Sequence, residues 1–193
     1  NKKVDYAYLF EGYSYYTPRA IYSLLNKGLR VKIALKPFKI DNKSYDYGTY
    51  LVPIQNQPLN SEKIYNLINE IASSNSLDVS GVTNGLTEGI DLGSDLFKII
   101  KKPKIGLIVG NGVRSYDAGE IWHLFDTKYS IPITKIDVDN INESNLDNYS
   151  HLILPDYSGA KIDINKIKSY VQKGGNLIAY RSSIKWLNEN KII

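Results

Sequence analysis

Hydrophobic and polar residues alternate along the first part of the chain in periods that predict a strand, a helix and a second strand. Residues 4–10 are apolar and aromatic, and residues 30–35 alternate charged and apolar positions. Between them, Thr17 is a candidate helix cap, Pro18 suits the first turn, and Gly28 is a typical stop. We therefore expect a parallel strand pair joined by a right-handed crossover.

The same alternation continues to the end of the chain. Further strands are expected at residues 49–54, 77–82, 104–109, 133–138, 151–154 and 176–180, and further helices after Ser61, from Asp117 with Glu120 as a capping pair, and over residues 163–173. Eight candidate strands alternating with helices predict an α/β fold with a doubly wound, mostly parallel sheet and helices on both faces, a three-layer sandwich.

Residues 101–103 have the character of a junction. We expect an N-terminal α/β half over residues 1–102 and a C-terminal α/β half over residues 103–193. One continuous domain is the alternative, because the strand and helix pattern runs through both halves.

Composition narrows the possible functions. The chain has 193 residues, of which 42% are hydrophobic, enough to fill a core without covalent staples. It has no cysteine, which excludes disulfides, thiolate nucleophiles and cysteine metal sites. We expect no membrane span and no nucleic-acid partner, since long apolar runs are absent and the net charge of +4 comes from scattered lysines. The sequence begins at Asn1 and contains no methionine, so we expect a piece of a longer protein.

A glycine-containing loop follows the apolar strand at residues 104–109. Gly110 to Ser115 resembles a phosphate-cradling turn, although serine stands where the third glycine of a dinucleotide site belongs. Asp137 falls where a ribose-binding acid would sit. A tight turn that needs glycine geometry is the favoured alternative. The candidate contact residues of this loop are Asn111, Arg114, Tyr116 and Asp117.

The most unusual stretch is the tyrosine-rich segment at residues 11–19, which lies between the first strand and helix. Its candidate contact residues are Glu11, Tyr13, Tyr15, Tyr16 and Arg19. Tyrosine combines a large apolar face with a polar tip and suits contacts with peptides, sugars or another domain. The alternative is a set of loop tyrosines packed over the sheet edge. Contact with another domain is the preferred interpretation.

No complete catalytic or metal site is expected. His123 and His151 are not expected to hold a metal, because neither begins a His-x-x-Glu or a His-x-x-x-His ligand pair. Ser182 and Ser183 follow a strand and precede a helix but lack the glycines of a nucleophile elbow, which disfavours a hydrolase.

Four motifs carry a resemblance to a known family. They are Tyr-Tyr-Thr-Pro-Arg-Ala-Ile-Tyr at 15–22, Tyr-Gly-Thr-Tyr-Leu-Val-Pro at 47–53, Gly-Ile-Asp-Leu-Gly-Ser at 89–94 and Tyr-Asp-Ala-Gly-Glu-Ile-Trp-His-Leu-Phe-Asp-Thr at 116–127. Together they resemble the region that follows the catalytic domain in bacterial zinc carboxypeptidase-like metallopeptidases. The pattern from Lys104 onward is also similar to the class I glutamine amidotransferase-like, flavodoxin-like fold.

The resemblance implies a function for the parent protein more than for this chain. The zinc ligands and the catalytic glutamate would belong to an upstream peptidase domain of the same polypeptide, so no cofactor is expected in this chain and zinc is expected in that absent domain. The family implies an extracytoplasmic location. We expect a non-catalytic accessory domain that packs on or assists the peptidase domain. The alternative is an α/β module that binds an anionic small molecule or a glycan through Arg19 and Arg114.

Overall fold

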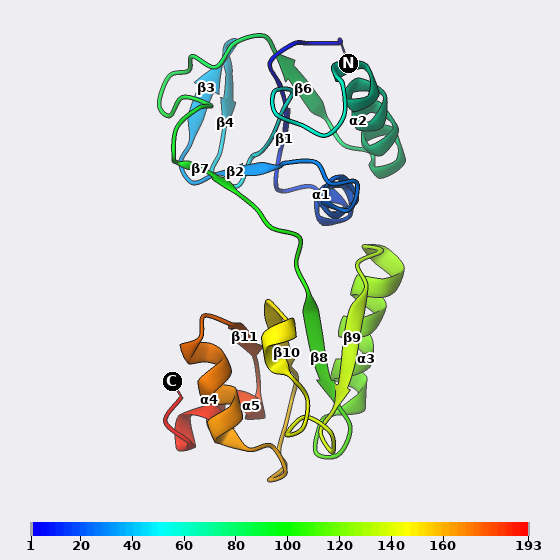
Figure 1. Cartoon of the computed structure of the whole chain (residues 1–193), viewed down its shortest axis with the longest axis vertical. Coiled ribbons are helices and arrows are strands. Elements are labelled where there is room, and N and C mark those ends of the chain that lie inside the picture. The colour runs from blue at the N-terminus through cyan, green and yellow to red at the C-terminus, as the bar shows by residue number, and fades with distance from the viewer. Residues whose placement is uncertain (1, 193) are drawn as a thin grey trace. The chain divides into compact units, whose positions relative to one another are not determined.

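The computed structural model describes residues 2–192 and divides into two compact units, with the boundary in the sequence between Lys102 and Pro103 (Figure 1). We call them unit 1 and unit 2 and describe each by itself. Within residues 2–192, no helix combines the length and apolar character that crossing a membrane requires.

Unit 1 is built on a five-stranded sheet with the order β6-β1-β5-β2-β7. Its elements are β1 (Ala7–Phe10), α1 (Thr17–Asn26), β2 (Lys32–Ala34), β3 (Phe38–Ile40), β4 (Lys43–Tyr45), β5 (Tyr50–Pro53), α2 (Ser61–Asn75), β6 (Val79–Val82) and β7 (Phe97–Ile99). Every neighbouring pair in this sheet is antiparallel. Strands β3 and β4 form a separate antiparallel hairpin.

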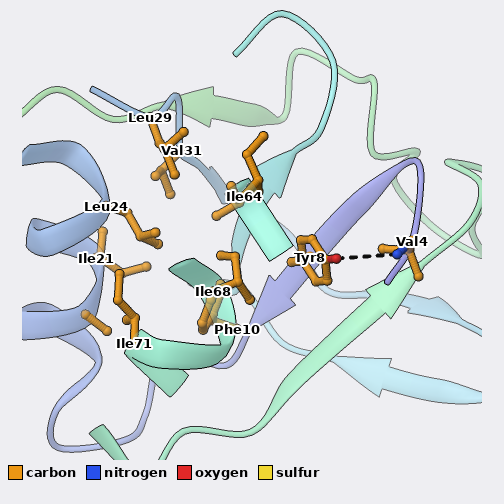
Figure 2. Close-up of a cluster of buried hydrophobic side chains, with 12 residues drawn as sticks. Val4, Tyr8, Phe10, Ile21, Leu24, Leu29, Val31, Ile64, Ile68 and Ile71 are labelled. Carbon is orange, nitrogen blue, oxygen red and sulfur yellow. Dashed lines mark hydrogen bonds between the residues drawn. The ribbon is translucent and has the colours of Figure 1, made fainter. Parts of the chain in front are cut away.

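The sheet of unit 1 is covered on both faces, and β1 shows why. Tyr8 and Phe10 point toward a cluster that includes side chains from both helices, among them Ile21 and Ile68 (Figure 2). Ala7 and Leu9 belong to a second cluster formed with the β3–β4 hairpin and the segment before β7. Because side chains alternate between the faces of a strand, all four residues of β1 are buried.

Unit 2 contains a four-stranded parallel sheet with the order β11-β10-β8-β9. Its elements are β8 (Ile105–Val109), α3 (Ser115–His123), the π-helical turn η1 (Leu124–Lys128), β9 (Ile133–Asp137), the 3₁₀ turn η2 (Leu146–Asn148), β10 (His151–Leu154), α4 (Ile164–Gln172), β11 (Asn176–Ala179) and α5 (Ser182–Glu189). The buried cluster of this unit joins one face of the sheet to α4 and α5, with Tyr157 and Leu152 among its fully buried members. Helix α3 instead contacts β8.

The expected fold class, a doubly wound and mostly parallel sheet, is wrong. The larger sheet is antiparallel throughout, and only the smaller sheet of unit 2 is parallel. Four strands, β2 to β5, follow α1 without an intervening helix, so unit 1 lacks the strand–helix alternation that a doubly wound parallel sheet requires. The expected parallel pair β1 and β2 is also wrong, because β5 lies between them and pairs antiparallel with both.

The expected helix caps also need correction. Helix α1 has Tyr16 as its N-cap residue, and Thr17 lies inside its first turn. Helix α2 is capped by Asn60, whose side chain accepts a hydrogen bond from the Lys63 amide at 2.9 Å. Helix α3 starts at Ser115, so Asp117 belongs to its first turn and does not cap it. In α2, Asn60 and Ser61 are both good cap residues and the structure uses the first, whereas Tyr16 and Arg114 make no side-chain cap hydrogen bond, so local capping does not decide where α1 and α3 begin.

Candidate functional site

Exposed tyrosines gather where two loops of unit 1 meet. Tyr13 is 81% exposed, Tyr15 56% and Tyr47 70%, although tyrosine is a residue that proteins usually bury in part. Gly12 approaches the turn before β5 so closely that a Cβ atom would lie 2.6 Å from the Gly48 carbonyl oxygen. The loop before α1 and the turn before β5 therefore form one surface, which we call the tyrosine edge.

The tyrosine edge rests on buried threonines. The hydroxyl of Thr17 donates to the backbone carbonyl of Glu11 at 3.1 Å, and the hydroxyl of Thr49 lies 3.2 Å from the Glu11 carboxylate. Thr17 and Thr49 are both fully buried. Glu11, a predicted contact residue, is thus used to join the two loops, which fixes the backbone that carries the exposed rings.

Arg19, the second charged candidate of this segment, is engaged within unit 1. Its Nε donates to the side-chain oxygen of Asn75 at 2.5 Å, and a terminal nitrogen donates to the Ser74 carbonyl at 2.9 Å. The guanidinium lies 4.4 Å from the centroid of the Tyr16 ring, whose edge meets Tyr15 at 4.9 Å between ring centroids. Arg19 and Tyr16 therefore fasten α1 to the end of α2.

In unit 2, two loops are joined at the carboxyl edge of the parallel sheet. The Arg114 amide donates to the Asp156 carbonyl at 2.9 Å, and the Ser158 amide donates to the Gly112 carbonyl at 3.0 Å. An isolated antiparallel bridge pairs Val113 with Tyr157. Because β8 and β10 are neighbours while β9 lies on the other side of β8, this is the switch point where open α/β sheets bind ligands.

Two arginines and two aspartates meet at this edge. Arg181 lies 3.4 Å from Asp117, a carboxylate whose side chain is only 7% exposed and whose Oδ2 forms no hydrogen bond. Arg114 lies 3.8 Å from Asp156. Hydrogen bonds from the Ser182 side chain and amide, with both arginines nearby, lower the pKa of Asp156. Each guanidinium thus already faces an acid, and the edge carries no excess of positive charge from these four residues.

The turn from β11 into α5 is strained at Arg181 and not at either serine. Arg181 takes φ 57° and ψ −130°, a strained conformation for a residue with a Cβ atom. The following amide, on Ser182, donates to the Asp156 carboxylate at 3.1 Å. The buried hydroxyl of Ser183 donates to the Pro155 carbonyl and accepts from the Tyr157 amide. Both serines therefore have structural partners.

The remaining candidates are distributed over both units. Asn111 and Tyr116 are exposed, and Tyr116 projects from α3 with 80% of its surface accessible. His123 is exposed, while His151 lies 2.9 Å from the Ser150 hydroxyl. Among the described residues, no three His, Asp or Glu side chains are grouped in a way that could hold a metal ion.

Sequence reasoning missed several residues of these surfaces. Tyr47 comes to the tyrosine edge from a different loop, and only the antiparallel return of β5 brings it there. Asp156 follows the strand at residues 151–154. Residues that follow the strands at a switch point are candidate site residues, so Asp156 could have been predicted if β10 had been placed beside β8.

These features define a two-unit α/β chain with a tyrosine-rich edge on one unit and an internally paired, charged carboxyl edge on the other. No protein-family model, curated protein or solved structure matches the chain.

Proposed function

We propose that this chain is a non-catalytic accessory domain of an extracytoplasmic zinc carboxypeptidase-like protein, in which it packs on the peptidase domain of the same polypeptide. The four motifs described above support the family. Zinc and the catalytic glutamate belong to the peptidase domain in this proposal. The role of the chain is to bind that domain and to stabilise it.

The observation that carries the proposal is the tyrosine edge of unit 1. Three tyrosine rings from two loops are mostly exposed on a backbone that buried hydroxyls hold in place. Tyrosine is enriched at protein interfaces, because it contributes apolar area at a low cost in side-chain entropy. Tyr15 and Tyr47 also lie at the ends of two of the family-like motifs.

The test uses the gene that encodes this chain, expressed together with the coding sequence upstream of residue 1. We would measure zinc content, peptidase activity and thermal unfolding with and without residues 1–193. A triple variant, Tyr13→Ser, Tyr15→Ser and Tyr47→Ser, removes the exposed rings, and Leu86→Ser is the control, since it removes an exposed apolar side chain of unit 1 that is not a candidate contact residue.

The triple variant should lower the stability of the isolated chain by no more than about 1 kcal/mol, because Tyr13 and Tyr47 are mostly exposed and only Tyr15 loses a ring contact, with Tyr16. In the longer protein it should lower the unfolding temperature of the peptidase domain and its activity, while the control variant leaves both unchanged. An upstream segment without zinc or peptidase activity overturns the family assignment. A zinc peptidase that is indifferent to the triple variant overturns the role of the tyrosine edge.

A further inference from the structure

A pocket of about 290 Å³ lies beside helix α3 in unit 2, between this helix and the edge strand β9. Its apolar lining comes from Val109, Val113, Ala118 and Trp122, and Lys135 of β9 also borders it. The motif at residues 116–127 contributes Ala118, Gly119 and Trp122 to this pocket, but the proposed accessory role does not use it.

The face of α3 that borders the pocket explains why space is left there. Ser115, Ala118 and Gly119 are small, and they lie on the same side of the helix as Trp122. A Cβ atom added at Gly119 would meet no atom within 4 Å. The small residues leave a hollow, and the partly exposed indole of Trp122 stands at its border.

Lys135 gives the pocket a positive charge. Its amino group lies 4.9 Å from the centroid of the Trp122 ring, a cation–π contact. Within residues 2–192, no acidic side chain forms an ion pair with Lys135. The nearby acid Asp137 is not a lining residue: it lies against Gly110, and its carboxylate accepts a hydrogen bond from the Asp139 amide. The Lys135 charge is therefore available to a ligand.

We propose that this pocket binds a small planar anion, such as an aromatic carboxylate, with its flat body against Trp122 and its negative group at Lys135. The volume is close to the lower limit of about 300 Å³ for ligand pockets, which suits a ligand of one or two rings. Ligand pockets are usually lined by apolar side chains that contact the ligand and by a few polar groups that orient it, and this pocket has both an apolar lining and one cation. The proposal is independent of the accessory role, since the tyrosine edge belongs to unit 1.

The two tryptophans of the chain provide a direct assay. Trp122 borders the pocket, whereas Trp186 packs edge-on against the buried Tyr157 ring at 5.3 Å. Their two indole N–H signals in a ¹⁵N-correlated NMR spectrum of the full chain would be assigned with a Trp186→Phe variant. Benzoate, benzamide and acetate would then be titrated separately. Benzoate should shift the Trp122 signal in a saturable way and leave the Trp186 signal in place.

Three variants separate the contributions to binding. Lys135→Met keeps the apolar stem and should weaken benzoate binding about five-fold, the equivalent of about 1 kcal/mol for a partly solvated charge pair, while benzamide binding stays the same. Gly119→Leu fills the hollow and should abolish binding. Gly119→Ala is its control, because it improves helix propensity without filling the pocket, and it should still bind.

Acetate should bind far more weakly than benzoate, because it lacks the ring. The proposal is overturned if benzoate produces no saturable shift of the Trp122 signal, or if both indole signals move together. Equal binding of benzoate and benzamide, or unchanged benzoate binding by Lys135→Met, overturns the anionic part of the ligand class. Unchanged binding by Gly119→Leu overturns the location.

Discussion

Tyr157→Phe removes one oxygen from the centre of unit 2, and its effect can be estimated from the contacts of that oxygen. Tyr157 is fully buried, and its hydroxyl accepts hydrogen bonds from the backbone amides of Lys161 at 3.1 Å and Ile162 at 3.3 Å. Phenylalanine keeps the ring and therefore the edge-on contact with Trp186. The substitution thus isolates the two hydrogen bonds from the packing.

Each lost hydrogen bond is worth about 0.5–1.5 kcal/mol, so the pair amounts to about 1–3 kcal/mol. The Ile162 amide is left without a partner beside a buried side chain, which places the expected loss near the middle of that range, about 2 kcal/mol. With a urea m value of about 1 kcal/mol per molar, the unfolding midpoint falls by about 2 M.

Tryptophan fluorescence during urea unfolding measures this loss selectively. The chain has two tryptophans, Trp122 and Trp186, and both belong to unit 2. Tyr116→Phe is the control, since that ring is 80% exposed and its substitution should leave the midpoint unchanged. A loss below about 0.5 kcal/mol for Tyr157→Phe, with an unchanged m value, would refute the reasoning, because it would mean that the two amides find other partners.

Three further predictions concern charged residues. The pKa of Asp156 is lowered in the folded chain, so the stabilisation by its carboxylate is complete above about pH 4 and is lost as the pH falls through the lowered pKa. The stability difference between wild type and Asp156→Asn should therefore shrink when urea titrations are made in acid. Arg19→Ala removes two hydrogen bonds to the last turn of α2 and should cost about 1–2 kcal/mol, with faster amide exchange in that turn. Arg181→Gly should destabilise unit 2, because it leaves the buried carboxylate of Asp117 without its cation. In an Asp117→Asn background the same substitution should stabilise unit 2 by about 1 kcal/mol, because it then only removes the backbone strain at residue 181.

Each of these predictions has a contrary outcome. A constant stability difference from pH 7 to pH 2 would show that the charge of Asp156 does not contribute. If amide exchange in the last turn of α2 is unchanged in Arg19→Ala, the two hydrogen bonds from Arg19 to that turn are not formed in solution. If Arg181→Gly changes the stability in the same direction with Asp117 present and in the Asp117→Asn background, the lost ion pair and the relieved strain do not oppose each other as argued.

The sequence predicted the elements of unit 2 more closely than those of unit 1. The continuous apolar run at residues 104–109 is typical of a strand buried on both faces, and it is the central strand β8. The strand at residues 151–154 has the bounds of β10. Long connections with helices between strands leave little freedom in pairing, so local pattern and parallel topology agree there.

In unit 1 the local pattern could not decide the pairing. Residues 41–48 are polar and rich in tyrosine, which predicts a turn, yet residues 43–45 form β4 and pair with β3. Only Asp41 and Asn42 form the tight connection between these two strands, and both adopt positive φ. Pro53 predicts that its strand ends there or lies at a sheet edge; β5 does end at this proline, and it lies in the centre of the sheet. The order of strands depends on contacts between distant segments, which periodicity does not report.

For the candidate sites too, local sequence features could be predicted and contacts between distant segments could not. The tyrosine-rich stretch was found from composition alone, and Tyr13 and Tyr15 are indeed exposed. Composition could not reveal that Arg19 turns back to α2, because its partners lie 55 and 56 residues away along the chain. Lys135 carried no signal in the sequence, since an alternating lysine on a strand is ordinarily a solvated residue.

Asp156 explains why the carboxyl edge of unit 2 differs from a usual ligand site. Helix N-termini at such an edge offer unpaired amides to a ligand. Here the carbonyl of Asp156 accepts from the amide of Arg114, the N-cap residue of α3, and its carboxylate accepts from the first amide of α5. One residue thus provides internal partners for the starts of two helices and draws the loops after β8, β10 and β11 together. A ligand of unit 2 is therefore better accommodated beside α3, where the apolar wall and Lys135 lie open.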